Sequence, residues 1–267
     1  MIEALERVTV AATCLPDAVR AYETLLGRRA RDGVSGASIR LANVRLDLVA
    51  DRSGKEGLTA LAFAVADLAG CERLLRRRGL PVERLADLGS STIPLRLLAD
   101  RQATHGVPIA FHPRPHVETP LSPTEPDAGE TAVAALDHLV IRTPNPERAI
   151  ALYAGRLGLD LRLDRSHADW GVRLLFFRCG ELIVELAHDL KVGLGEGEDC
   201  LWGLSWRVPD LLGAHARLRA AGLDVSDVRN GRRPRTLVFT VRSATAGVAT
   251  LLIGPHSSAA PQPMRAR

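Results

Sequence analysis

Two periodicities alternate along the chain, and together they predict strands followed by helices. The clearest example is Ala135–Gly158, which reads ALDHLVIRTPNPERAIALYAGRLG. Its first eight residues follow the period of two typical of a strand, and its second half repeats apolar residues at helical spacing. Asn145 is a suitable N-cap, Pro146 suits the first helical position, and Gly158 is a suitable end for the helix.

The residues that follow this helix predict about three further strands, and the same plan then repeats. Two strands are placed at Val172–Arg178 and Leu182–Ala187, joined by a tight turn at Cys179-Gly180. The next segment repeats the order with a strand at Leu201–Val208, a helix from its cap Asp210 to Gly222, and strands near Val225, at Thr236–Val241 and at Ala249–Ile253. Each segment is therefore a βαβββ unit.

The first half of the chain matches the second half. ALERVTV, from Ala4, aligns with ALDHLVI, from Ala135, and LTALAFAVADL, from Leu58, aligns with LWGLSWRVPDL, from Leu201. DAVRAYETLLG aligns with RAIALYAGRLG, and ATHGVPIAF with ATAGVATLL. The matches keep their order at nearly constant offsets, so the sequence predicts an α+β fold built from four βαβββ units.

Composition changes mark the limits of the two halves. The stretch from His112 to Thr131 is rich in proline and acidic residues and has no periodicity, as expected of an exposed linker. We therefore expect an N-terminal domain at 1–115, a linker at 116–131, a C-terminal domain at 132–256 and a disordered tail at 257–267.

The overall composition excludes several classes of function. The 267 residues are 46% hydrophobic without an apolar run long enough to span a membrane, and no signal peptide is recognised. The four cysteines are scattered, which favours a reduced, cytoplasmic setting. The net charge is only +4 and 4% of residues are aromatic, so a nucleic-acid partner is not expected. The cluster Arg76-Arg77-Arg78 suits the negative end of a predicted helix.

The repeat resembles the vicinal oxygen chelate superfamily, which includes glyoxalase I, extradiol dioxygenases, and fosfomycin- and bleomycin-resistance proteins. The resemblance lies in DHLVIRTPNPERAIALYAGRLGL, RLLFFRCGELIVEL and WRVPDLLGAHARLRAAGLDV and in their recurrence along nearly all of the chain. It implies that paired units form cups with helices outside, so that this chain has two cups.

The resemblance also implies where a metal would bind. Family members that bind metal place a ligand in the first strand of a unit and a carboxylate in its last strand; here these positions hold His138 and Glu185. We expect their side chains to face one cavity within roughly 5 Å of each other. Zinc, iron, manganese or nickel would suit this pair. The fourth unit has Gly203 and Leu251 instead, and two protein ligands are fewer than the usual three.

Without a metal, His138 and Glu185 are equally compatible with a buried hydrogen-bonded pair, or with Glu185 as a catalytic base beside an oriented histidine. Arg142, Arg173 and Arg207 are candidates to hold an anionic group of a ligand, and Trp170 is a candidate pocket wall. Strand parity places Trp202 and Trp206 under the helices.

In the N-terminal half the two ligand positions hold Arg7 and Asp47, for which a salt bridge is the simplest interpretation. That half is expected to serve packing or homodimer formation. Two functions remain open. One is an enzyme of the glyoxalase, isomerase, lyase or dioxygenase type, acting with a divalent metal on a small oxygenated substrate in the C-terminal cup. The other is a metal-free protein that binds or sequesters a small molecule.

Overall fold

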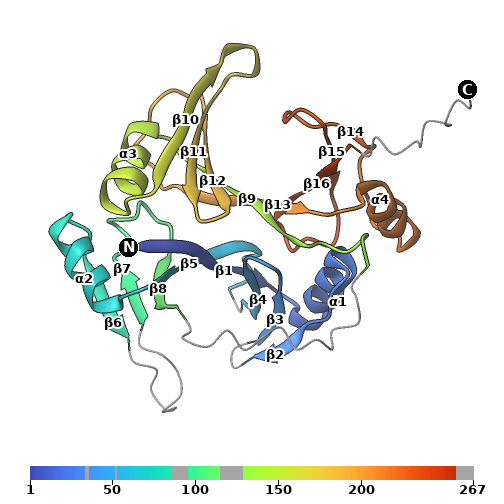
Figure 1. Ribbon diagram of the computed structural model, residues 1–267, viewed down its shortest axis with the longest axis horizontal. Helices are drawn as coiled ribbons and strands as arrows, with labels where there is room; N and C mark the ends of the chain where they lie inside the picture. The colour runs from blue at the N-terminus through green and yellow to red at the C-terminus, as the bar shows by residue number, and fades with distance from the viewer. Residues whose placement is uncertain (34–35, 52, 86–95, 115–128, 257–267) are drawn as a thin grey trace, which may run out of the picture.

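The computed structural model describes residues 1–33, 36–51, 53–85, 96–114 and 129–256. Most of the predicted linker and the predicted tail lie outside these residues. The chain folds into two halves, each with one eight-stranded mixed sheet (Figure 1). Of the described helices, none is long and apolar enough to cross a membrane.

Each half contains two βαβββ units, as the sequence predicted. The first unit is β1 (Ile2–Ala12), α1 (Leu15–Leu26), β2 (Arg31–Gly33), β3 (Gly36–Arg40) and β4 (Arg45–Ala50). The second is β5 (Gly57–Val65), α2 (Leu68–Arg77), β6 (Val82–Leu85), β7 (Arg96–Ala99) and β8 (Ile109–Pro113). Their strands form one sheet in the order β2-β3-β4-β1-β5-β8-β7-β6.

The second half repeats this arrangement. The third unit is β9 (Ala135–Arg142), α3 (Pro146–Ile150) continued by a π-helix (Ala151–Arg156), β10 (Asp160–His167), a single 3₁₀ turn (Ala168–Trp170), β11 (Val172–Cys179) and β12 (Leu182–Asp189). The fourth is β13 (Cys200–Arg207), α4 (Leu211–Ala220), β14 (Arg229–Asn230), β15 (Thr236–Val241) and β16 (Ala249–Pro255). The sheet order is β10-β11-β12-β9-β13-β16-β15-β14.

The predicted helix caps are present. The Asn145 side chain accepts a hydrogen bond from the backbone N–H of Arg148, and the Asp210 side chain accepts one from Gly213. The helix that follows Asn145 differs from the expectation in its last turns, which are π-helical. There the N–H of Leu157 donates to the carbonyl of Leu152. This wider turn keeps Leu152, Tyr153 and Leu157 all in the core.

The two halves share one hydrophobic core, and strands of one half contact strands of the other, β13 with β5 and β11 with β1. The buried apolar residues of both halves form a single cluster. Figure 1 shows α1 beside α4 and α2 beside α3. The guanidinium of Arg217, on α4, donates to the carbonyl oxygens of Thr24, Leu25 (3.1 Å) and Thr131 (3.3 Å). Arg217 thus satisfies carbonyl groups at the C-terminus of α1, which have no partner within that helix.

Arg217 should therefore contribute measurably to the stability of the assembled halves. We expect Arg217→Ala to lower the free energy of unfolding by about 2–3 kcal/mol, because carbonyl groups lose a charged donor in a partly buried place. Equilibrium unfolding in urea measures this change. Arg219→Ala is the matched control, because Arg219 lies two residues further along α4 and is exposed. Equal losses in the two variants would contradict a bridging role for Arg217.

Candidate functional site

The candidate site lies on the concave face of the C-terminal sheet, where β9 pairs with β13. This antiparallel pairing sets His138 opposite Ser205 and Val140 opposite Gly203. Two residues have no partner across the pair: Asp137 in β9 and Trp202 in β13. Each is an extra residue in its strand, a β-bulge, which turns its side chain away from the direction that strict alternation predicts.

The first bulge joins Asp137, His138 and Glu185 into one chain of polar contacts. His138 Nδ1 lies 2.9 Å from Asp137 Oδ2, and His138 Nε2 lies 3.7 Å from Glu185 Oε2. The second distance agrees with the separation expected from the sequence. Arg233 donates to both carboxylate oxygens of Asp137, each at 3.3 Å. Asp137 therefore fixes the histidine ring so that Nε2 faces Glu185.

The two carboxyl groups of this chain are shifted in opposite directions. Burial raises the pKa of Glu185, although nearby His138 and Arg232 act against this shift. Burial also acts to raise the pKa of Asp137, but its hydrogen bond to His138, the charge of His138 and the contacts with Arg233 outweigh it and lower the pKa. Carboxyl groups with pKa values displaced in opposite directions are typical of sites that move protons.

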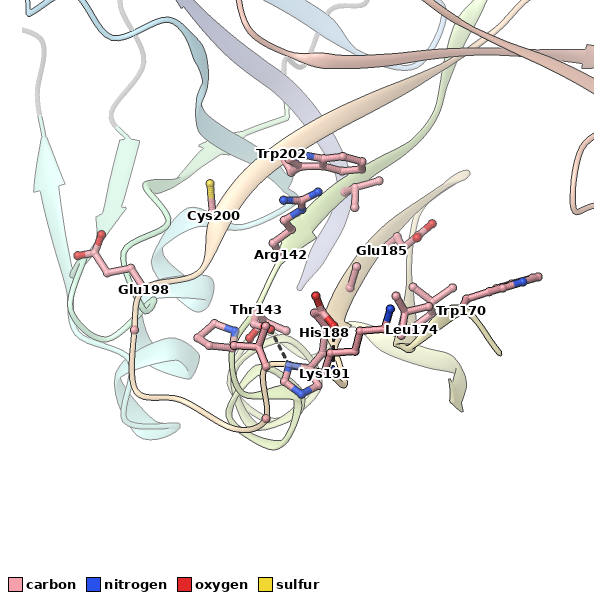
Figure 2. A pocket seen from close by; sticks show the side chains of 18 of the residues that line it. Arg142, Thr143, Trp170, Leu174, Glu185, His188, Lys191, Glu198, Cys200 and Trp202 are labelled. Atoms are coloured by element: carbon pink, nitrogen blue, oxygen red, sulfur yellow. Dashed lines mark hydrogen bonds between the residues drawn. The ribbon is translucent and has the colours of Figure 1, made fainter. Parts of the chain in front are cut away.

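A cavity of about 560 Å³ opens above Glu185 (Figure 2). Its apolar wall consists of Val140, Val172, Leu174 and Ala187, and its charged residues are Arg142, Glu185, Asp189, Lys191, Glu198 and Arg232. Trp170, His188, Cys200 and Trp202 also line it. This volume is in the range of sites that enclose a small molecule.

Two of the side chains proposed from the sequence to contact a ligand lie in this cavity. Arg142 lines it, with its guanidinium carbon 4.2 Å from the centroid of the Trp202 ring. Trp170 also lines it and stacks on His167 at 4.2 Å between ring centroids. Figure 2 shows Arg142 and Trp202 on one side of the cavity and Trp170 on another.

Arg173 and Arg207 do not line this cavity. Arg173 shares the helix-covered face of β11 with Leu175 and bonds to Asp164 and Glu147. The expectation that Arg173 faces the cup was therefore wrong. Arg207 is exposed at the end of β13.

Sequence reasoning missed several residues of the site. Trp202 was expected under the helices; instead it is 40% exposed and lines the cavity, because the bulge at this position interrupts the alternation. Trp206 is fully buried, as expected. Arg232 and Arg233 reach the site from the segment between β14 and β15. Their adjacency in NGRRPR was the only signal for them in the sequence.

The residues present do not complete a metal site. The strand register confirms that Gly203 and Leu251 are equivalent to His138 and Glu185. Glu185 pairs with Val140, two residues after His138, and Leu251 pairs with Ser205, two residues after Gly203. Gly203 and Leu251 cannot donate to a metal. Within the described ranges, no group of three His, Cys, Asp or Glu residues could hold a metal ion. His138 and Glu185 alone are fewer donors than the three of an open catalytic centre.

Two other histidines do not supply the third donor. His188 lines the cavity but is itself buried, and its Nδ1 lies 3.0 Å from the carbonyl oxygen of Thr143. The backbone of His256 pairs with Arg235 after the end of β16. His256 does not line the cavity.

The N-terminal cup has the same strand positions, but residues of different chemistry occupy them. Glu6 is one of two extra residues of β1, and it takes the position that Asp137 occupies in β9. Arg7 takes the place of His138, and its Nε lies 3.3 Å from Oδ2 of Asp47, the equivalent of Glu185. The predicted salt bridge is present. A guanidinium donates hydrogen bonds only, so this half cannot use Arg7 as a base or as a metal ligand.

Comparison with known proteins agrees with this architecture. A family model described as the glyoxalase/bleomycin resistance protein/dioxygenase superfamily matches residues 137–239. An ethylmalonyl-CoA/methylmalonyl-CoA epimerase from Cereibacter sphaeroides is 29% identical over 104 residues, which are 35% of this chain and 75% of that protein.

Solved structures share the fold of the whole chain. A 2,2',3-trihydroxybiphenyl 1,2-dioxygenase from Sphingomonas wittichii strain RW1 has a TM-score of 0.72 and 18% identity, covering 95% of this chain and 91% of the dioxygenase. An Mn(II)-bound glyoxalase from Novosphingobium aromaticivorans has a TM-score of 0.69 and 13% identity, covering 95% and 82%. At these identities the likeness concerns the fold alone.

Residues 137–239 match the glyoxalase/bleomycin resistance protein/dioxygenase superfamily, and the whole chain has the fold of two tandem domains of the vicinal oxygen chelate type, as the repeat predicted.

The raised pKa of Glu185 predicts a pH-dependent stability. Because the folded protein holds this proton more tightly than the unfolded chain, the stabilisation is present below the ordinary pKa of 4.5 and is lost as pH rises through the folded-state pKa. Glu185→Gln cannot ionise, so we expect it to gain stability relative to the wild type as pH rises from about 4 to about 7. Urea unfolding at several pH values measures this gain.

Glu198→Gln is the matched control, because the Glu198 side chain is 73% exposed at the cavity mouth. A difference between Glu185→Gln and the wild type that stays constant over the same pH range would show that burial does not raise the pKa of Glu185.

The incomplete donor set predicts weak metal binding. We expect protein purified without chelator or affinity-tag metal to contain well under one equivalent of divalent metal, and His138→Ala to lose little stability through loss of metal. Elemental analysis and calorimetric titration with Mn²⁺ and Zn²⁺ measure both points. Tight one-to-one binding without ligand, abolished by Glu185→Gln, would mean that another residue completes the site.

Proposed function

We propose that the C-terminal cup binds a small oxygenated molecule and that the protein is a proton-transfer enzyme of the isomerase or lyase type, with Glu185 as its base. The observation that carries this proposal is the chain of contacts Asp137–His138–Glu185, in which Glu185 lines the cavity and His138 lies beside Glu185 without lining it. A buried carboxyl group with a raised pKa has a basicity better matched to neutral pH than an exposed one.

The geometry supports a division of roles. Asp137 accepts the proton on His138 Nδ1 and so leaves Nε2 directed at Glu185. At 3.7 Å, the Nε2–Oε2 separation exceeds a hydrogen bond, which leaves both groups free to bond to a substrate between or above them. Glu185 would remove a proton from carbon next to a carbonyl group, and protonated His138 would donate to the developing oxygen anion.

The relative from Cereibacter sphaeroides supports proton transfer as the reaction class. It is named as an epimerase. Epimerisation at a carbon next to a carbonyl group begins with removal of its proton and ends with return of a proton to the opposite face. Glu185 would perform the removal, and the returning proton would come from a second acid or from water on the other side of the substrate. No part of this route requires a third metal donor.

Binding without chemistry is the second candidate function. It is favoured by Gly203 and Leu251, which leave the fourth unit without a functional group opposite His138 and Glu185. A protein that only sequesters its ligand would need the cavity and its tryptophan walls but not the basicity of Glu185.

Hydrogen exchange in deuterated water separates these functions. We expect the wild-type protein to exchange the carbon-bound proton of methylmalonyl-CoA, or of a member of a panel of small 2-oxo acids, as followed by proton NMR. Glu185→Gln keeps the shape of the side chain and should lower the rate by about 10²–10⁴-fold. Glu181→Gln, exposed in the turn between β11 and β12 and outside the cavity lining, should leave it unchanged. Exchange that persists in Glu185→Gln would rule out Glu185 as the base.

A further inference from the structure

We propose that the ligand of the C-terminal cup is a small organic anion with an apolar body, and that Arg142 and Arg232 hold its carboxylate or phosphate group. The inference rests on the proposed use of this cavity. It concerns binding rather than chemistry, and it identifies the class of molecule from the cavity's own charges.

The two guanidinium groups are fixed on aromatic rings. Arg142 lies 4.2 Å from the centroid of the Trp202 ring, and Arg232 lies 4.1 Å from that of Trp170. Trp170 is itself stacked on His167. An indole contacts the flat face of a guanidinium and leaves the N–H groups at its edge free, in the plane that matches a carboxylate or phosphate. Both arginines are therefore held in place without losing their donors.

These cations have no carboxylate partner among the described residues, unlike other arginines around the site. Arg148, Arg173 and Arg233 each pair with an aspartate or glutamate. No described carboxylate lies within 4.0 Å of the cationic groups of Arg142, Lys191 or Arg232. The cup wall thus keeps three cations available.

The acidic residues that line the cavity have other contacts. Glu185 faces His138, and Glu198 lies 4.0 Å from Arg101. Asp189 accepts the backbone N–H of Lys191 at 2.9 Å. Arg232 is near enough to Glu185 for its charge to lower the pKa of that carboxyl, but none of these described carboxylates forms an ion pair with either stacked arginine, as a bound anion would. Charge-assisted hydrogen bonds to such an anion are the strongest the cavity can offer.

The remaining wall selects the body of the ligand. Val140, Val172, Leu174 and Ala187 give the same cavity an apolar wall. The cavity of about 560 Å³ accommodates a molecule of ring size rather than an inorganic ion alone. The expected ligand therefore combines an acid group with a hydrocarbon or aromatic part.

Three matched probes test this inference: benzoate, phenyl phosphate and benzamide, which is uncharged and has nearly the shape of benzoate. Ligand-observed NMR titration gives their dissociation constants. We expect wild-type protein to bind benzoate or phenyl phosphate at least tenfold more tightly than benzamide. The tighter of the two anions identifies a carboxylate or a phosphate as the natural acid group. Arg142→Gln and Arg232→Gln should each weaken the anion about tenfold and leave benzamide unchanged.

Arg207→Gln is the matched control, since Arg207 is exposed on the same sheet but does not line the cavity. Arg142→Lys keeps a positive charge without the planar fork, so it should lose part of the affinity even if Arg142→Gln fails to fold. Equal affinity for benzoate and benzamide, or anion binding that both arginine variants retain, would overturn the inference.

Failure of this inference is distinguishable from failure of the proposed function. Glu185→Gln should still bind the anion, because it removes the base and leaves both arginines. Anion binding without proton exchange in the wild type supports this inference and overturns the enzymatic proposal. Proton exchange without anion selectivity supports the enzymatic proposal and overturns this inference.

Discussion

The pairing of β9 with β13 is the constraint on which the candidate site depends. These two strands join the third and fourth units into one sheet, and their register sets His138 against Ser205. Each strand has one extra residue, and both extra residues serve the site. The bulge at Asp137 brings its carboxylate to His138 Nδ1, and the bulge at Trp202 brings an indole under Arg142. A regular ladder would place both side chains on the helix-covered face.

The N-terminal half has β-bulges at the same positions but with different side chains. Its strands β1 and β5 have extra residues at Glu6 and Thr59, the positions equivalent to Asp137 and Trp202. The bulges are therefore a property of the repeated unit. Arg7 and Asp47 neutralise each other where His138 and Glu185 stand in the other cup. An arginine remains charged at all ordinary pH values and only donates hydrogen bonds, whereas a histidine ring nitrogen can also accept one. One fold thus holds a permanent ion pair in one cup and a histidine–carboxyl pair in the other.

Periodicity and caps were sufficient to predict the fold. Alternation and helical spacing gave all four units, and Asn145 and Asp210 cap their helices as expected. His138 and Glu185 could be placed because the family resemblance implies a ligand in the first strand of a unit and a carboxylate in its last strand. Trp202 could not, since a single extra residue reverses strand parity without any change in composition. Arg232 could not, because it reaches the cavity from an irregular segment. Arg173 shares the strand parity of Leu175 and Phe177, which pack under the helix, and this parity sets it away from the cup.

The cavity also depends on the N-terminal half, although that half supplies none of its lining residues. The segment between β12 and β13 forms part of the rim through Gly197 and Glu198. The carbonyl oxygen of His105 accepts the backbone N–H of Asp199 at 2.8 Å, which anchors this segment to the N-terminal half. Arg156, in the π-helix, donates to the carbonyl of Ala103 at 3.4 Å in the same turn. A backbone hydrogen bond fixes position without depending on side-chain identity. The N-terminal half can therefore lack a histidine–carboxyl pair of its own and still hold the rim of the other cup in place.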